Sequence, residues 1–250
     1  MNLLTLAIDS TAATATCALS RGGRLVALNT VDGRLTHSEI LLPMVERMLA
    51  DSALTLDDVD MFACATGPGS FTGVRIGAAM IKGLAFANGK PCIGVSTLEA
   101  LAYNLTPITV QSGMSADSYA PLVVPVMDAR RGQVYTAIFR SGERLMEDSL
   151  IKLDELREKL AGYDCDIYFC GDGYDAALSF FADDSRICET PPLMIPHNAF
   201  SVAYTAEKIY SGADDKTIFT CERLSPKYLR APQAERERLE RLQREQQATV

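Results

Sequence analysis

The residues that usually bind transition metals are scarce in this chain. It contains only two histidines, His37 and His197, and none of its seven cysteines forms a C-x-x-C pair. A zinc site is therefore disfavoured, because it normally takes several cysteine and histidine ligands. The cysteines are odd in number, and five of them lie in or beside apolar runs. We interpret them as reduced packing residues rather than as a disulfide framework.

Long apolar segments are also missing. No uncharged apolar run reaches about 18 residues, the length that predicts a membrane-spanning helix. The N-terminal residues MNLLTLAIDSTAAT lack the basic region and the small-residue cleavage site of a signal peptide. We therefore expect a soluble, cytoplasmic protein. Its 250 residues, 48% hydrophobic and 22% charged, suffice for one large or two small globular domains.

Basic residues are the minority among the charged residues. The chain has 24 lysines and arginines against 32 aspartates and glutamates, and its formal net charge at pH 7 is -8. A protein that binds a nucleic acid by itself usually has a basic face or a basic overall balance. Strong direct RNA binding is thus disfavoured, and we expect contact with RNA to run mainly through a more basic partner.

The first hundred residues alternate between short apolar runs and segments of helical periodicity. Three sequential runs separated by turn residues predict antiparallel strands, and two longer periodic segments predict helices between further strands. The strands are predicted over residues 3–8, 15–19, 25–31, 59–66 and 91–95, and the helices over residues 36–50 and 72–87.

The same order begins again after a Ser-, Thr- and Pro-rich stretch at residues 105–120, which is typical of a loop or domain crossover. Aligning Asp9 with Asp128, an offset of 119 residues (128 minus 9), also aligns three further identical pairs, among them Ala18 with Ala137. We interpret the two halves as copies of one unit. In the second copy, strands are predicted over residues 122–128, 133–139, 141–145 and 166–170, and helices over residues 153–160 and 174–181.

A β-β-β-α-β-α unit that occurs twice is the layout of the ribonuclease-H-like fold of actin, sugar kinases and chaperone ATPases. We therefore predict an α/β protein of two ribonuclease-H-like lobes with this actin-like (ASKHA) architecture, in which nucleotide normally binds between the lobes. The N-terminal lobe is expected at residues 1–104 and a smaller C-terminal lobe at residues 105–197. Residues 198–230 should form a closing helix, capped by Asn198, and a strand that return to the first lobe, followed by a charged, solvated tail at residues 231–250.

The turns after the first strand of each copy are where this fold would handle phosphate. Asp9 begins the turn DSTAAT, which contains no glycine for a close approach of the backbone to phosphate. Asp9 could equally cap its own turn through backbone hydrogen bonds. In the second copy, Arg130 and Arg131 stand beside Asp128 and could neutralise it. We therefore expect remnants of phosphate turns without magnesium chemistry, at Asp9, Ser10, Asp128, Gly171 and Gly173.

The segment TGPGSFTGVRIG, residues 66–77, joins a predicted buried strand to a helix. It is not a P-loop, because Val74 and Arg75 follow Gly73 where a P-loop needs lysine and then serine or threonine. A dinucleotide-binding turn remains an alternative, since strand, glycine-rich turn and helix occur in the required order. Its position late in a β-β-β-α-β unit disfavours that alternative.

The two helices of the first copy carry more apolar residues than one sheet face can bury. In the first, Thr36 and Glu39 have the spacing of a capping box, which gives the intervening His37 a structural explanation. A second metal ligand on the same face would stand four residues later, and that residue is Leu41. The second helix has only Arg75 and Lys82 as charged residues. Both helices indicate a protein partner, with burial by the other lobe as the alternative.

Several motifs together resemble one family. HSEILLPMVERML, TGPGSFTGVRIGAAMIKGLA, GVSTLEALA, MDARRGQVYTAIF, GDG and LSPKYLR occur in the order seen in the bacterial TsaB (YeaZ) family of tRNA threonylcarbamoyladenosine biosynthesis proteins. The resemblance extends from Leu3 to about Arg230, and only the charged tail falls outside it. The combination of GPGSFTGVRIG with the upstream HSE and the downstream MDARRGQVY is specific, whereas each motif alone is weaker.

The resemblance implies a non-catalytic subunit that pairs with TsaD, a larger paralogue that holds the metal and transfers the threonylcarbamoyl group to tRNAs that decode ANN codons. It also implies the ATPase TsaE as a partner, a functional link to TsaC, and ATP and metal bound by partners rather than by this chain. The H-x-x-x-H metal motif of TsaD is incomplete here, because Leu41 follows His37. In this family the pairing surface comes from the two N-lobe helices, through which the free protein could also pair with itself. The interface residues expected on this basis are His37, Ile40, Leu41, Met44, Val45, Met48, Phe71, Thr72, Val74, Arg75, Ile76 and Met80.

Two enzymatic alternatives stay open at this point. An independent ATPase or phosphotransferase of the same fold should show Mg-ATP binding and turnover, and the glycine-free turn at Asp9 argues against it. A dinucleotide-binding enzyme should be stabilised by NAD, because a ligand at 100 times its dissociation constant adds about 2.7 kcal/mol to the free energy of unfolding.

Overall fold

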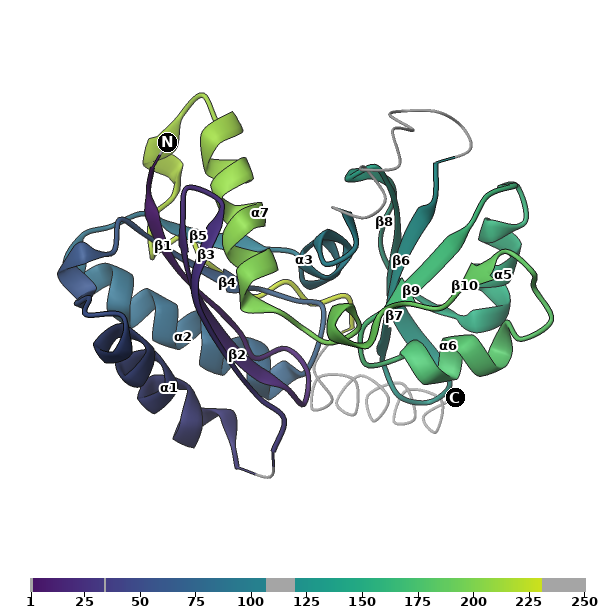
Figure 1. Ribbon diagram of the computed structural model, residues 1–250, viewed down its shortest axis with the longest axis horizontal. Helices are drawn as coiled ribbons and strands as arrows, with labels where there is room; N and C mark the ends of the chain where they lie inside the picture. Colours follow the sequence, from purple (N-terminus) through teal and green to yellow (C-terminus); the bar gives the residue numbers. More distant parts are fainter. Residues whose placement is uncertain (1, 34, 107–119, 231–250) are drawn as a thin grey trace, which may run out of the picture.

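The N-terminal lobe is built on a mixed five-stranded sheet. The computed structural model describes residues 2–33, 35–106 and 120–230, and Figure 1 shows two lobes side by side. The strand order of the first sheet is β3-β2-β1-β4-β5, in which β1 pairs antiparallel with β2 and parallel with β4. Its elements are β1 (Leu4–Asp9), β2 (Ala15–Arg21), β3 (Arg24–Val31), α1 (His37–Asp51), η1 (Leu56–Asp58), β4 (Met61–Ala65), α2 (Phe71–Asn88), β5 (Cys92–Val95) and α3 (Thr97–Tyr103).

The C-terminal lobe repeats this topology. Its strand order, β10-β9-β6-β7-β8, is the order of the first sheet when β6 is placed on β1 and β8 on β3. The 119-residue offset that aligns Asp9 with Asp128 holds across all three antiparallel strands, so the predicted duplication and the predicted fold class are confirmed. Its elements are β6 (Leu122–Asp128), β7 (Gln133–Arg140), β8 (Glu143–Lys152), α5 (Leu153–Leu160), β9 (Ile167–Cys170), α6 (Tyr174–Phe180), β10 (Ile187–Cys188) and η2 (Pro192–Met194).

Helices cover both faces of the first sheet. Figure 1 shows α1 and α2 on one face and α7 (Ala199–Gly212) on the other. Apolar side chains of α1 and α2 pack with alternate residues of β1 and β2, whereas Val202, Ala203 and Ala206 of α7 pack with Ala7 on the opposite face. The predicted caps are present: the Glu39 carboxylate accepts from Thr36 N at 2.9 Å, and Asn198 Oδ1 accepts from Phe200 N at 2.9 Å.

The chain after α7 runs along the N-terminal lobe without forming a regular strand. After η3 (Lys216–Ile218) it makes isolated backbone contacts. Cys92 N donates to Phe219 O at 3.0 Å and Lys227 N donates to Thr66 O at 2.7 Å. Most of the predicted crossover at residues 105–120 and the whole tail at residues 231–250 lie outside the described residues.

A helix that the residue pattern left unassigned joins the two lobes. α3 is buried along almost its whole length, and its Leu98 and Leu101 pack in one cluster with Val123 of β6 and Phe139 of β7. Periodicity could not reveal it, because six of its seven residues are buried and leave it almost no polar face. The lobes therefore share an apolar core as well as a cleft. Within the described ranges, no helix is long and apolar enough to cross a membrane.

Candidate functional site

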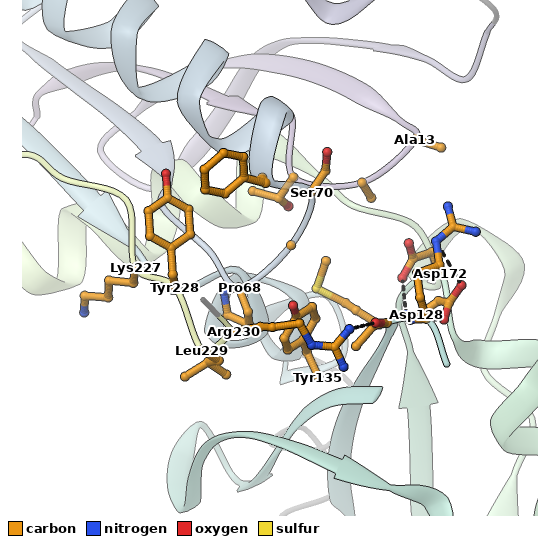
Figure 2. A pocket seen from close by; sticks show the side chains of 17 residues that line it. Ala13, Pro68, Ser70, Asp128, Tyr135, Asp172, Lys227, Tyr228, Leu229 and Arg230 are labelled. Atoms are coloured by element: carbon orange, nitrogen blue, oxygen red, sulfur yellow. Dashed lines mark hydrogen bonds and ion pairs between the residues drawn. The ribbon is translucent and has the colours of Figure 1, made fainter. Parts of the chain in front are cut away.

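A cavity of about 450 Å³ lies between the lobes, and Figure 2 shows its lining side chains. The lobes contribute the β1–β2 turn and the start of α2 on one side, and the end of β6 with the following turn, β7 and the loop after β9 on the other. The returning segment before the tail completes the lining. The lining residues are Thr11, Ala12, Ala13, Pro68, Gly69, Ser70, Phe71, Met127, Asp128, Ala129, Arg130, Tyr135, Asp172, Lys227, Tyr228, Leu229 and Arg230.

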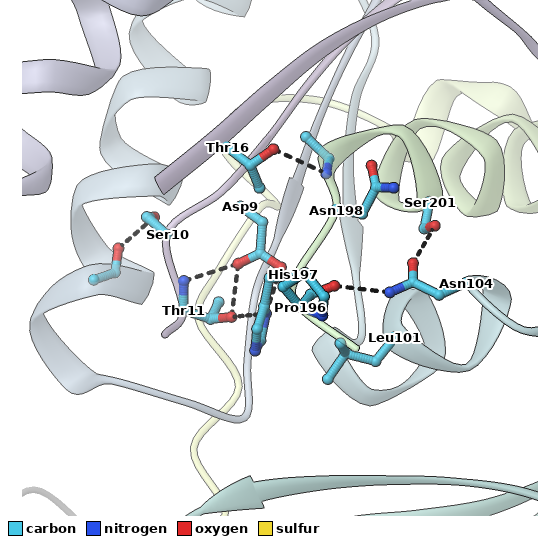
Figure 3. A network of polar contacts seen from close by, with 12 residues as sticks. Asp9, Ser10, Thr11, Thr16, Leu101, Asn104, Pro196, His197, Asn198 and Ser201 are labelled. Carbon is cyan, nitrogen blue, oxygen red and sulfur yellow. Dashed lines mark hydrogen bonds and ion pairs between the residues drawn. The ribbon is translucent and has the colours of Figure 1, made fainter. Parts of the chain in front are cut away.

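Asp9 lies beside this cavity but is tied into the protein, as Figure 3 shows. Its Oδ1 accepts hydrogen bonds from the backbone N of Thr11 at 2.8 Å and from Thr11 Oγ1 at 2.6 Å. Its Oδ2 lies 3.0 Å from Nδ1 of His197. Asp9 and His197 side chains are both 1% exposed. Both carboxylate oxygens thus have protein partners, and Asp9 caps its own turn.

The buried pair shifts both ionisation equilibria. Burial alone would raise the pKa of Asp9, but the charge and hydrogen bond of His197, together with the hydrogen bonds from Thr11, outweigh it, and the pKa is lowered. Burial alone would likewise lower the pKa of His197, yet Asp9 raises it. No local pattern in the sequence marks His197 as a site residue, because 188 residues separate it from Asp9.

The corresponding position in the second lobe is open to solvent. Asp128 is exposed, its backbone N donates to Asp172 Oδ1 at 3.1 Å, and its Oδ2 lies 3.7 Å from Arg130 Nε. Desolvation raises the pKa of the Asp172 carboxyl, although this residue is exposed at the cavity. Gly171 and Gly173, which flank Asp172, approach the Val126 carbonyl so closely that a Cβ on either would lie within 3.0 Å of it. These glycines therefore have a packing role.

Packing also accounts for the glycines of the segment at residues 66–77. A Cβ on Gly67 would lie 2.4 Å from Lys227 O, one on Gly69 2.5 Å from Thr11 O, and one on Gly73 1.9 Å from Ser10 O. In addition, Ser10 Oγ donates to Gly73 O at 2.8 Å. The glycine-rich segment thus lets α2 and the returning chain close tightly over the β1–β2 turn.

Bound Mg-ATP, which the fold class implies, does not fit the residues around Asp9. A magnesium ligand must offer free oxygen lone pairs, and phosphate needs close backbone approach. Both Asp9 oxygens are engaged by Thr11 and His197, and the approach of Gly69 and Gly73 is filled by the protein's own backbone. Among the described residues, no group of three or more histidine, cysteine, aspartate or glutamate side chains could hold a metal ion.

The predicted interface residues fall into two groups. Leu41, Met44, Val45 and Met48 of α1 and Val74 of α2 are at most 7% exposed and belong to the protein's own core. The expectation that these five form the partner surface therefore needs correction: the first sheet buries more of each helix than the apolar count suggested. The more accessible members are His37, Ile40, Phe71, Thr72, Arg75, Ile76 and Met80.

Two exposed apolar side chains were absent from the predicted interface. Phe86 of α2 is 74% exposed and Leu42 of α1 is 45% exposed. The spacing of Leu42 in the apolar run hid it among core residues, and Phe86 stood at the end of an almost uncharged helix. His37 is anchored locally, since its Nε2 lies 3.1 Å from Ala13 O in the β1–β2 turn.

Two ribonuclease-H-like lobes that meet at a cavity place the protein in the actin-like ASKHA class. Residues 34–240 match the family model TsaD, described as tRNA N6-adenosine threonylcarbamoyltransferase. A Bacillus subtilis protein named tRNA threonylcarbamoyladenosine biosynthesis protein TsaB is 35% identical over 69% of this chain and 72% of its own length. The chain therefore belongs to this threonylcarbamoyladenosine family, on its TsaB (YeaZ) branch.

Other relatives agree with this assignment. The Haemophilus influenzae protein of the same name is 40% identical over 54% of this chain, a match that spans about half (52%) of that relative. The structure of YeaZ from Pseudomonas aeruginosa is 25% identical, with a TM-score of 0.67 over 91% of this chain and 100% of that one.

Proposed function

We propose that this chain is a non-catalytic subunit of a tRNA threonylcarbamoyladenosine synthesis complex, which pairs with and activates a catalytic paralogue of the TsaD type. In this role the paralogue transfers the threonylcarbamoyl group to the anticodon-loop adenosine of tRNA. TsaE joins as the ATPase, TsaC supplies the activated intermediate, and the chain pairs with itself when the paralogue is absent.

The state of Asp9 carries the non-catalytic part of the proposal. The aspartate that would hold magnesium in this fold is buried, bonded through both oxygens, and paired with a histidine. Freeing it would leave an unpaired buried His197, which costs several kcal/mol. A shared core also joins the lobes through α3, which opposes the opening and closing that a catalytic cleft requires.

The outer surface of α1 and α2 supports the pairing part. Contiguous exposed apolar area marks interaction sites, and Phe86 is 74% exposed on a helix without an acidic residue. Leu42 and Met80 add apolar area on the same side of the sheet. Buried aromatic anchors dominate the energy of many protein interfaces, so Phe86 is the residue we expect to contribute most.

The test is co-purification of the full chain with its TsaD-type paralogue, followed by a threonylcarbamoyl-transfer assay. We expect Phe86→Glu to weaken pairing by at least about 2 kcal/mol, roughly 30-fold in Kd, and to lower transfer in parallel. Leu193→Glu is the matched control, because Leu193 is 90% exposed in η2 of the other lobe.

Two results would count against the proposal. One is normal pairing by a folded Phe86→Glu variant, which would remove the helix surface from the interface. The other is Mg-ATP turnover by the isolated chain, which would favour the independent ATPase despite the occupied Asp9.

A further inference from the structure

The rim of the interlobe cavity carries positive charge in an acidic protein. Arg130, Lys227 and Arg230 line the cavity, and Arg75 reaches its edge with its guanidinium 3.8 Å from the ring centroid of the lining residue Phe71. We call these four residues the cationic rim. They come from three separate parts of the chain, and the whole chain has a net charge of -8, so their convergence is produced by the fold.

Two guanidinium groups of the rim are held by neutral partners. Arg230 donates to the backbone carbonyl of Ala129 at 2.6 Å and to the side-chain oxygen of Gln133. Arg75 donates from Nε to Tyr228 Oη at 2.9 Å. Within the described part of the chain, no salt bridge joins Arg75, Lys227 or Arg230 to a carboxylate. Their charge is therefore available to an external anion.

The carboxylates in the cavity lining only partly offset the positive charge of the cationic rim. Arg130 lies 3.7 Å from Asp128, but its side chain is 86% exposed, so this ion pair is weak in water. The left-handed backbone at Arg130, with φ of 64°, keeps the residue at the tip of its turn. Asp172 is the other carboxylate in the cavity lining, and its Oδ1 accepts a hydrogen bond from Asp128 N at 3.1 Å.

Aromatic side chains stand among these cations. Tyr228, 39% exposed, packs against Phe71 with ring centroids 5.0 Å apart, and Tyr135 lines the wall beside Arg230. Figure 2 shows Tyr228, Arg230 and Tyr135 along one side of the cavity. Cations that follow a phosphate chain, interleaved with aromatic faces on which bases stack, are the features of single-stranded nucleic-acid sites.

We propose that the cationic rim contacts RNA, binding the phosphodiester groups of an unpaired strand while a base stacks on Tyr228. The open position of Arg130 and Lys227 favours a strand that passes over the mouth, rather than a small ligand enclosed by the cavity. The contact adds to RNA binding by partner subunits, in keeping with the acidic balance of the chain.

The test uses the full chain alone and a fluorescein-labelled single-stranded RNA of about ten nucleotides, a length within the usual site size. Anisotropy titrations at several salt concentrations give the slope of log K against log [salt], which is about -0.7 per phosphate neutralised on a single strand. We expect Arg130→Gln and Lys227→Gln each to make the slope shallower by about 0.7. Neither substitution breaks a buried ion pair, because the contact of Arg130 with Asp128 is exposed.

Lys159→Gln is the matched control, because Lys159 is exposed on α5, outside the cavity lining, and its loss changes the net charge equally. Tyr228→Leu should weaken binding without changing the slope, since it removes stacking but no charge. The proposal is overturned if RNA binding is undetectable at about 50 mM salt, where phosphate contacts are strong, or if the rim variants match Lys159→Gln.

Adenosine monophosphate is titrated in parallel to separate a free nucleotide from a strand. Binding of the nucleotide that depends on Arg130 and Lys227, without binding of RNA, would also overturn the proposal and assign the rim to a small nucleoside phosphate. The rim variants avoid α1 and α2, so loss of pairing through Phe86 and loss of RNA contact are distinguishable.

Discussion

Asp9 and His197 form a buried pair whose contribution to the free energy of unfolding should depend on pH. The pKa of Asp9 is lowered from 3.8, so its contribution is present above that pH and is lost as pH falls. The pKa of His197 is raised from 6.5, so its contribution is present below that pH and is lost as pH rises through the folded value. The pair should therefore stabilise the fold most between these two values.

Removing one partner tests this at the level of single residues. We expect Asp9→Asn to lower the free energy of unfolding by about 3–5 kcal/mol near pH 5, and by less at pH 8. Thermal unfolding across this range measures the difference. The NMR titration of His197, assigned against a His37→Gln variant, should have its midpoint above 6.5 and fall in Asp9→Asn. A pH-independent effect of Asp9→Asn would contradict an ionised pair.

At the level of elements, the close approach of α2 to the β1–β2 turn sets the geometry of the outer surface of α1 and α2 and of the cationic rim. Gly73 touches the Ser10 carbonyl, whereas no atom lies within 4 Å of a Cβ placed on Gly83 of the same helix. We expect Gly73→Ala to destabilise the protein by about 1–3 kcal/mol through overpacking. Gly83→Ala should instead stabilise it by up to about 1 kcal/mol through helix propensity. Urea unfolding compares them, and equal effects would rule out the tight contact.

The burial of Leu41 is likewise set by the packing of α1 on the first sheet. Its side chain is 1% exposed in the N-terminal core, so a charge at this position would unfold the lobe. A loss of pairing in such a variant would therefore say nothing about the interface. A charge at Phe86, which is exposed, should instead weaken pairing without unfolding the lobe. Amphipathic spacing correctly located both helices, but it could not say which side of an almost wholly apolar helix faces the sheet.

At the level of the whole molecule, α3 and β8 hold the lobes together. Arg144 of β8 pairs with Glu99 of α3 at 3.2 Å and also with Asp148, which accepts from Ser96 Oγ at 2.6 Å. We expect Arg144→Ala to increase amide hydrogen exchange in α3 roughly tenfold, because charged hydrogen bonds of this kind contribute about 1.5 kcal/mol or more. Arg157→Ala, which removes a pair to Asp183 within the second lobe, should leave α3 unchanged. Equal amide exchange of α3 in the two variants would mean that the ion pairs of Arg144 do not hold the lobes together.

Much of this architecture was predictable from local patterns. The strand and helix order of each copy, the internal duplication, the caps at Thr36 and Asn198 and the local capping by Asp9 all depend on neighbouring residues, and the structure contains each of them. The family followed from motifs spread along the chain. These features are encoded by spacing of two to four residues, by turn residues, or by runs of identical motifs.

Contacts between distant residues were decided only by the tertiary structure. The pairing of Asp9 with His197, the burial of α3 between the lobes and the convergence of Arg75, Arg130 and Arg230 on one cavity each join parts of the chain far apart in sequence. A residue's periodicity reports that it has an apolar face but not what covers it. The sequence by itself thus determined the units and their order. The packing of the helices on their sheets decided which helix residues are core and which are surface, and the meeting of the two lobes decided where positive charge collects on an acidic protein.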